Sequence, residues 1–157
     1  MFSMAHLHLL VNHFPIIGSM FISVMFIIAL LFKNVFLQKV SLWFLVGTAL
    51  STALTYASGG GTKAAVQGLP EASDTMLAAH EQAARYGLII MFVAGALALG
   101  GIVFYSRRPV LPLYFRISVL VVLLISVVVL SYIGFLGGQI MHPEIRSFIS
   151  LPFFKTL

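Results

Sequence analysis

The chain has 157 residues, of which 61% are hydrophobic and 8% are charged. A soluble domain carries about 25% charged residues, so this composition predicts an integral membrane protein. The absence of cysteine excludes disulfides, thiolate metal sites, iron–sulfur clusters and covalent haem attachment through C-x-x-C-H. We attribute the net charge of +5 to membrane topology, and we do not expect nucleic acid as a partner.

Four long apolar runs follow one another along the chain, each near the ~20 residues that a helix needs to cross a bilayer. Only helices and closed barrels span lipid, and the runs are too long and too uniformly apolar for strands. The predicted spans cover residues 12–32, 40–58, 75–106 and 113–141. The expected fold is therefore all-α: one membrane domain over residues 1–157, an up-down-up-down four-helix bundle.

The start of the first span has two interpretations. Asn12 is suited to cap a helix whose first turn holds Pro15, where proline is tolerated. Alternatively, the helix begins near Ser3 and kinks at Pro15. The third span has a clearer start, because Ser73 or Asp74 is a good N-cap.

Between the second and third spans the chain is rich in glycine. We expect a flexible turn at Gly59–Gly61, then a short interfacial helix over residues 62–68 that Gly68 and Pro70 stop. The whole segment Gly59–Ser73 would form a long loop covering the outer end of the bundle. The apolar tail 147–157 is too short to span and is expected in the membrane interface.

Charge sorting predicts the orientation. The loops after spans one and three carry five basic residues and no acidic ones: Lys33, Lys39, Arg107, Arg108 and Arg116. By the positive-inside rule these loops are cytoplasmic. Both termini would then face outward, into the periplasm if the protein lies in a bacterial inner membrane.

Small residues recur four apart where helices would touch, a spacing that allows close packing in lipid. The pairs are Gly47 and Ser51, Ala53 and Ala57, Ala94 and Ala98, and Gly134 and Gly138.

The predicted topology gathers all five histidines at one face of the membrane. Imidazole ligates haem iron, zinc and copper. We expect His13 and His80 to be the axial pair of a haem, with His8 and His142 as a second pair or as substitutes. His6, near the terminus, is expected to be a surface residue.

Several features favour haem b over zinc or copper, although those metals and a protein without cofactor remain open. Gly87 lies one heptad after His80, and Gly134 and Gly138 lie beneath His142, so a flat macrocycle would find room there. One haem is expected, and four histidines would suffice for two. The propionates would meet basic side chains, for which the candidates are Arg85, Arg146 and Lys63.

Three motifs resemble those of a bacterial four-span inner-membrane family of unassigned function. Residues 7–15, LHLLVNHFP, resemble its L-H-P-x-x-V-H-F-P opening, with Leu9 in place of proline. Residues 80–84, HEQAA, resemble its H-E-x-A segment, and residues 134–139, GFLGGQ, resemble its closing G-W-L-G-G-E. The resemblance implies that four of the histidines are the family's own (His8, His13, His80 and His142) and suggests a relation to small b-type cytochromes.

The sequence thus predicts a small membrane b-type cytochrome, or a membrane subunit of a redox complex, rather than a complete enzyme. It would pass electrons between quinol and a periplasmic carrier or a larger redox partner. The main alternative is a structural subunit without cofactor in a larger membrane assembly. A third is a periplasm-facing metal-binding protein.

Overall fold

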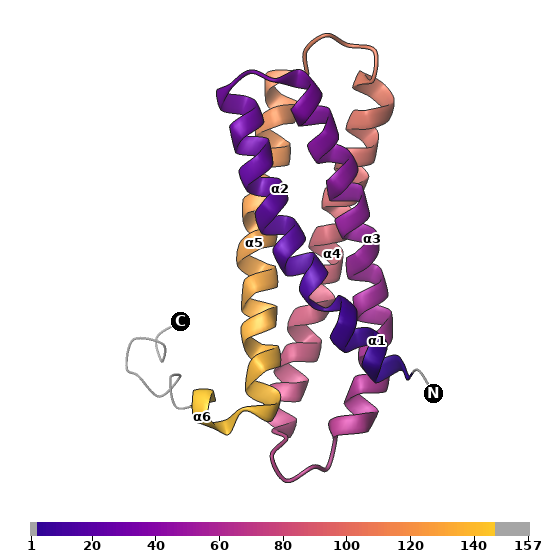
Figure 1. Ribbon diagram of the computed structural model, residues 1–157, viewed down its shortest axis with the longest axis vertical. Coiled ribbons are helices and arrows are strands. Elements are labelled where there is room, and N and C mark those ends of the chain that lie inside the picture. Colours follow the sequence, from indigo (N-terminus) through magenta and orange to yellow (C-terminus); the bar gives the residue numbers. More distant parts are fainter. Residues whose placement is uncertain (1–2, 147–157) are drawn as a thin grey trace.

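The computed structural model describes residues 3–146, and the predicted interfacial tail 147–157 lies outside them. The described chain is helical throughout apart from short connections (Figure 1). Its helices are α1 (Met4–Val11), α2 (His13–Leu31), α3 (Val35–Val66), α4 (Asp74–Tyr105), α5 (Leu113–Met141) and the short α6 (Pro143–Arg146).

Four long apolar helices form an antiparallel bundle, with α1 and α2 together making the first of them. Each is long and apolar enough to cross a membrane, so the chain is a multi-pass membrane protein. Around the bundle, α2 packs against α3, α3 against α4, α4 against α5, and α5 against α2. Phe26, Met91 and Leu123 are fully buried at the centre, whereas Phe92 and Phe104 are exposed on the outside, as lipid-facing side chains are.

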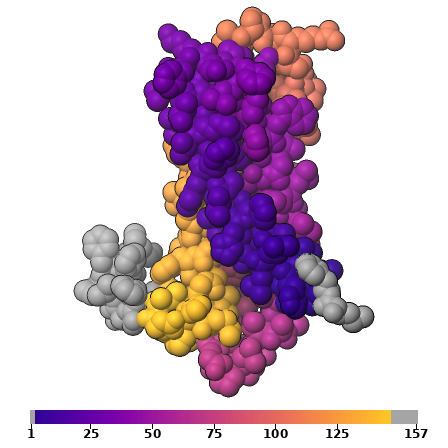
Figure 2. Space-filling view, viewed as in Figure 1, coloured from indigo at the N-terminus to yellow at the C-terminus, as the bar shows by residue number. Residues whose placement is uncertain are grey.

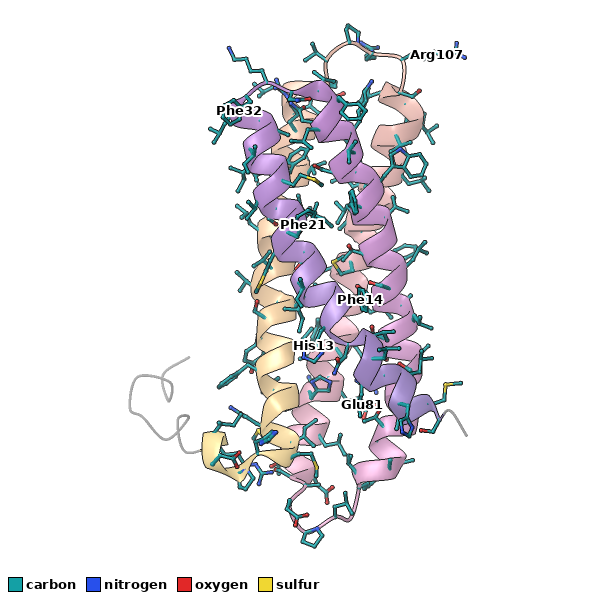
Figure 3. The ribbon with its side chains drawn as sticks, viewed as in Figure 1. His13, Phe14, Phe21, Phe32, Glu81 and Arg107 are labelled. Atoms are coloured by element: carbon teal, nitrogen blue, oxygen red, sulfur yellow. The ribbon has the colours of Figure 1, made fainter. Side chains whose placement is uncertain are left out.

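The two ends of the bundle differ in chemistry. One end, here the basic end, holds the connections after α2 and after α4, where Figure 3 labels Phe32 and Arg107. There Lys39 donates to the carbonyls of Ser106 and Arg108, at 2.7 and 3.0 Å, and so caps the end of α4. The opposite end, here the histidine end, holds the start of α1, the connection from α3 to α4, and α6.

The first long helix breaks at Asn12, with the N-terminal cap at Ser3 and Pro15 in the first turn of α2. The helix therefore begins near Ser3, as the second interpretation expected, and α2 begins after Asn12, whose side chain makes no cap hydrogen bond. Proline has no N–H, so Pro15 leaves the Val11 carbonyl without its helical donor. The Thr55 hydroxyl of α3 lies 3.2 Å from that carbonyl and 2.9 Å from the Ser51 carbonyl of its own helix, and it shares its one proton between the two. The neighbouring helix thus satisfies the group that the break exposes.

The glycine-rich segment after the second span is not the predicted loop and interfacial helix. Helix α3 continues through Gly59–Gly61 to Val66, and only residues 67–73 connect it to α4. The prediction was wrong because the glycines serve packing here: a Cβ at Gly61 would collide with Met4, and one at Gly59 would touch His8. Helix α1 lies against this glycine face, and tertiary contact outweighs the low helix propensity of glycine.

The predicted small-residue pairs have different roles. Ala94 and Ala98 are fully buried in the core, as expected of a helix-packing pair. Gly134 meets Ile16 of α2, and Gly138 faces Ile145 of α6. Ala53 and Ala57 are exposed, and a Cβ added at Gly47 would meet no atom within 4 Å. Sequence spacing alone therefore did not distinguish helix contacts from open surface.

Candidate functional site

Two of the five histidines, His8 and His80, are partly buried, and both belong to contacts between helices. The other three are exposed: His6 on α1, His13 at the start of α2 and His142 after α5. The positions of His8 and His80 are set by backbone carbonyls of neighbouring helices. They form the candidate site.

His8 extends from α1 toward α3. Its Nδ1 lies 2.9 Å from the Thr55 carbonyl oxygen and 3.2 Å from the Ser58 hydroxyl. That hydroxyl donates its own proton to the same carbonyl. Since the Thr55 carbonyl can only accept, Nδ1 carries the proton, so Nε2 is the nitrogen that can offer a lone pair to a ligand.

His80 has the same arrangement between α4 and α5. Its Nδ1 lies 3.0 Å from the carbonyl oxygen of Ile133 and therefore donates to it. The ring lies against Gly137, where a Cβ would be 3.1 Å from the imidazole Cε1. Because glycine has no Cβ, it leaves room for the His80 ring to pack against α5.

Gly87 and Gly134 do not leave the empty space that the sequence suggested. A Cβ at Gly87 would collide with Ile133, and one at Gly134 would lie 2.7 Å from the Cδ1 of Ile16. Apolar side chains therefore occupy the space beside both glycines. The glycine that contacts the His80 ring is Gly137 of α5, not Gly87 of its own helix.

The two anchored imidazoles belong to one region. They are near enough to interact electrostatically, and within the described residues neither Nε2 has a hydrogen-bond partner. Helix α1 packs on α3 and, in the part of the chain that the structure describes, makes no close backbone contact with α4 or α5. The first helix therefore diverges from α5 at the histidine end, as Figure 1 shows.

Asn12 adds an unsatisfied polar atom to this region. It follows His8 by four residues with helical backbone angles, so both side chains lie on one face. Its Oδ1 is buried and has no hydrogen-bond partner. Buried polar atoms are rarely left so, which makes this atom an indicator of a missing partner.

The other predicted ligands lie elsewhere. His13, labelled in Figure 3, lines a groove between α2 and α3. His142 pairs with Glu144 at 2.8 Å, and the pKa of the Glu144 carboxyl is lowered first by its own backbone N–H and then by His142. His6 contacts the Ser3 hydroxyl at 2.7 Å, in keeping with its expected surface position.

The three basic residues expected to meet propionates have partners within the chain. Lys63 and Arg85 both pair with Glu81, at 2.8 and 3.0 Å. Their two positive charges exceed its single negative charge, and Glu81 adjoins His80. Arg146 donates to the carbonyls of Glu71, Gln139 and Ile140, and so ties the connection before α4 to the end of α5.

The geometry suits a group that takes two nitrogen ligands. A metal-bound histidine usually donates its other ring N–H to a carbonyl or carboxylate, which fixes its tautomer and orientation. His8 and His80 both do this with a carbonyl. Across residues 3–146 no three histidine or acidic side chains converge as a metal cluster, whereas structural zinc takes four ligands.

Sequence reasoning missed the groups that orient the two histidines. The acceptors are main-chain carbonyls of Thr55 and Ile133, and such carbonyls cannot be recognised from the residue type.

Comparison of the chain with family models, with curated proteins and with solved structures found no match. The family resemblance therefore rests on the three motifs quoted above, and the structure shows a membrane bundle of four long apolar helices.

Proposed function

We propose that this protein is a small membrane b-type cytochrome or the membrane subunit of a redox complex, with His8 and His80 as the axial ligands of one haem. The observation that carries the proposal is the matched hydrogen bonding of the two rings. Each donates Nδ1–H to a carbonyl and keeps Nε2 for a ligand. A haem bound there supplies a one-electron couple.

The chain's own residues would set the properties of the site. The carbonyls of Thr55 and Ile133 hold each imidazole in the tautomer that presents Nε2. Gly59 and Gly137 let the two rings lie close to α3 and α5. Lys63 and Arg85 place net positive charge around Glu81, the residue after His80 in the chain, which favours an anionic group such as a propionate. Asn12 offers one more hydrogen-bonding group on the face of His8.

The proposed pair differs from the one preferred from sequence. His13 and His80 lie at different helix contacts, and His13 faces a groove on the outside of the bundle. His8 instead shares with His80 a ring N–H donated to a main-chain carbonyl of a neighbouring helix. With the basic end in the cytoplasm, the site would face the periplasm and serve an electron carrier or a larger redox protein there.

A spectrum of the purified protein tests the proposal. Reduced-minus-oxidised bands of b-type haem are expected, with one haem per chain. His8→Ala and His80→Ala should each lower the haem content or shift the reduction potential, because the iron loses a strong ligand. His6→Ala is the matched control on the same helix as His8, and it should leave both quantities unchanged.

Other outcomes would decide against this assignment. If His13→Ala removes haem and His8→Ala does not, the ligand pair is His13 and His80. A folded protein without haem bands would favour the structural subunit, and metal analysis of the same sample would reveal zinc or copper.

A further inference from the structure

A second site lies on the outside of the bundle, in a groove between α2 and α3. Its volume is about 570 Å³, within the range of small-molecule sites. The lining is aromatic and apolar apart from His13 and two hydroxyl residues; it includes Phe14, Phe21, Trp43, Phe44 and Gly47. The groove runs along two membrane-spanning helices, so it opens to lipid rather than to water.

The shape of the groove follows from its glycines. Gly18 lets α2 approach α3 closely, since a Cβ there would lie 2.9 Å from the Thr48 hydroxyl. Gly47 has no atom within 4 Å of its Cβ position, so the floor of the groove is open there. Phe21 and Phe44 meet edge to face, with ring centroids 6.1 Å apart. Figure 2 shows that α2 forms the front of the bundle on this side.

The polar group sits at one end of the groove. His13 is the first residue of α2, near the middle of the bundle in Figure 3, and Phe21 lies about 12 Å further along the helix axis. In the described part of the chain the His13 ring has no hydrogen-bond partner, and it is exposed. An occupant that fits would place one polar atom at His13, a flat ring among the aromatic side chains and an apolar tail beyond them.

We propose that this groove binds the ring of an isoprenoid quinone or quinol, with His13 hydrogen-bonded to a ring oxygen. A quinone ring offers oxygen acceptors and a quinol offers hydroxyl donors, and a neutral imidazole can meet either. A phospholipid has oxygens at its esters and headgroup but no flat ring to place among the aromatic side chains. The inference rests on the proposed function and extends it by placing the electron donor on the outside of the same bundle, but quinone binding itself does not require haem.

The single tryptophan makes binding measurable. Trp43 lines the groove and is the chain's only tryptophan, so quenching of its fluorescence reports on this site alone. A short-chain quinone such as decylubiquinone, titrated into the protein in nanodiscs, should quench the fluorescence saturably. Gly47→Leu should abolish saturable quenching because its side chain fills the open floor. His13→Leu should weaken binding about five- to tenfold, the loss expected of one hydrogen bond.

The matched control is Gly100→Leu, which adds the same side chain at another open glycine, on α4. It should bind quinone as the native protein does. If an alkyl chain without a ring competes equally well, or if Gly47→Leu leaves saturable quenching intact, the groove is not a quinone site. Haem content measured on the same samples separates the two proposals. Quinone binding by a protein without haem would refute only the cytochrome proposal. A protein that holds haem but does not bind quinone would refute only the proposal of a quinone site in the groove.

Discussion

At the scale of single residues, Thr55 connects the two parts of the first helix to the candidate site. Its hydroxyl contacts the Val11 carbonyl, which Pro15 leaves without a donor, and its own carbonyl accepts from His8. One residue of α3 thus stabilises the break in the first helix and orients a proposed ligand. The site depends on this tie because α1 has no close backbone contact with α4 or α5 among the described residues.

Thr55→Val should loosen α1. The variant keeps the carbonyl that holds His8 but leaves the Val11 carbonyl without its partner, which should cost about 1 kcal/mol of unfolding free energy. Hydrogen exchange of amides in α1 should accelerate, while exchange in α4 and α5 should not change.

Ser118→Ala is the control, because the Ser118 hydroxyl donates only to Tyr114 of its own helix. It should alter stability by less than about 0.5 kcal/mol. Unchanged exchange in α1 of Thr55→Val would show that other contacts hold this helix.

At the scale of elements, glycines determine how closely the helices approach. A Cβ at Gly95 of α4 would lie 2.7 Å from the Ala49 Cβ of α3, a distance that real Cβ atoms do not reach. A Cβ at Gly101 would collide with the ring of Phe115 on α5. Helices in lipid associate through such close packing, since no hydrophobic force drives apolar surfaces together there.

Gly95→Leu should therefore separate α3 from α4 and lower the unfolding free energy by about 1–3 kcal/mol. Gly100→Leu, which meets nothing within 4 Å, should be tolerated. Unfolding in increasing denaturing detergent, followed by circular dichroism, compares the two. Equal stability of both variants would contradict the close α3–α4 packing.

At the scale of the whole molecule, the excess of positive charge and most of the histidines lie at opposite ends of the bundle. The five basic residues of the short connections lie at one end, and His6, His8, His80 and His142 lie toward the other, with Lys63, Glu81 and Arg146. This separation follows from helices of alternating direction, and the positive-inside rule assigns the basic end to the cytoplasm.

The cysteine-free chain allows a direct test of orientation. Single cysteines introduced by Asn34→Cys at the basic end and by Gln67→Cys at the histidine end should differ in labelling by a membrane-impermeant maleimide. In intact cells Gln67→Cys should react and Asn34→Cys should react only after permeabilisation. The reverse pattern would move the proposed haem site to the cytoplasmic side.

The sequence by itself determined the number of long helices, their alternating direction and the end at which the histidines gather. These features follow from apolar length and from the placement of charge, which are local properties of the chain. The first residues of α4 and α5 also lie close to the starts of the expected spans, because Ser73 caps α4 and Pro112 precedes α5.

Only the tertiary structure decided which histidines come together. The positions of His8 and His80 depend on the Thr55 and Ile133 carbonyls and on the path of α1 across the glycine face of α3. The sequence suggested a turn at Gly59–Gly61 because isolated glycines disfavour helix, and only packing against α1 reverses that preference. Main-chain acceptors and helix–helix contacts join residues far apart in the chain, so local pattern could not reveal them.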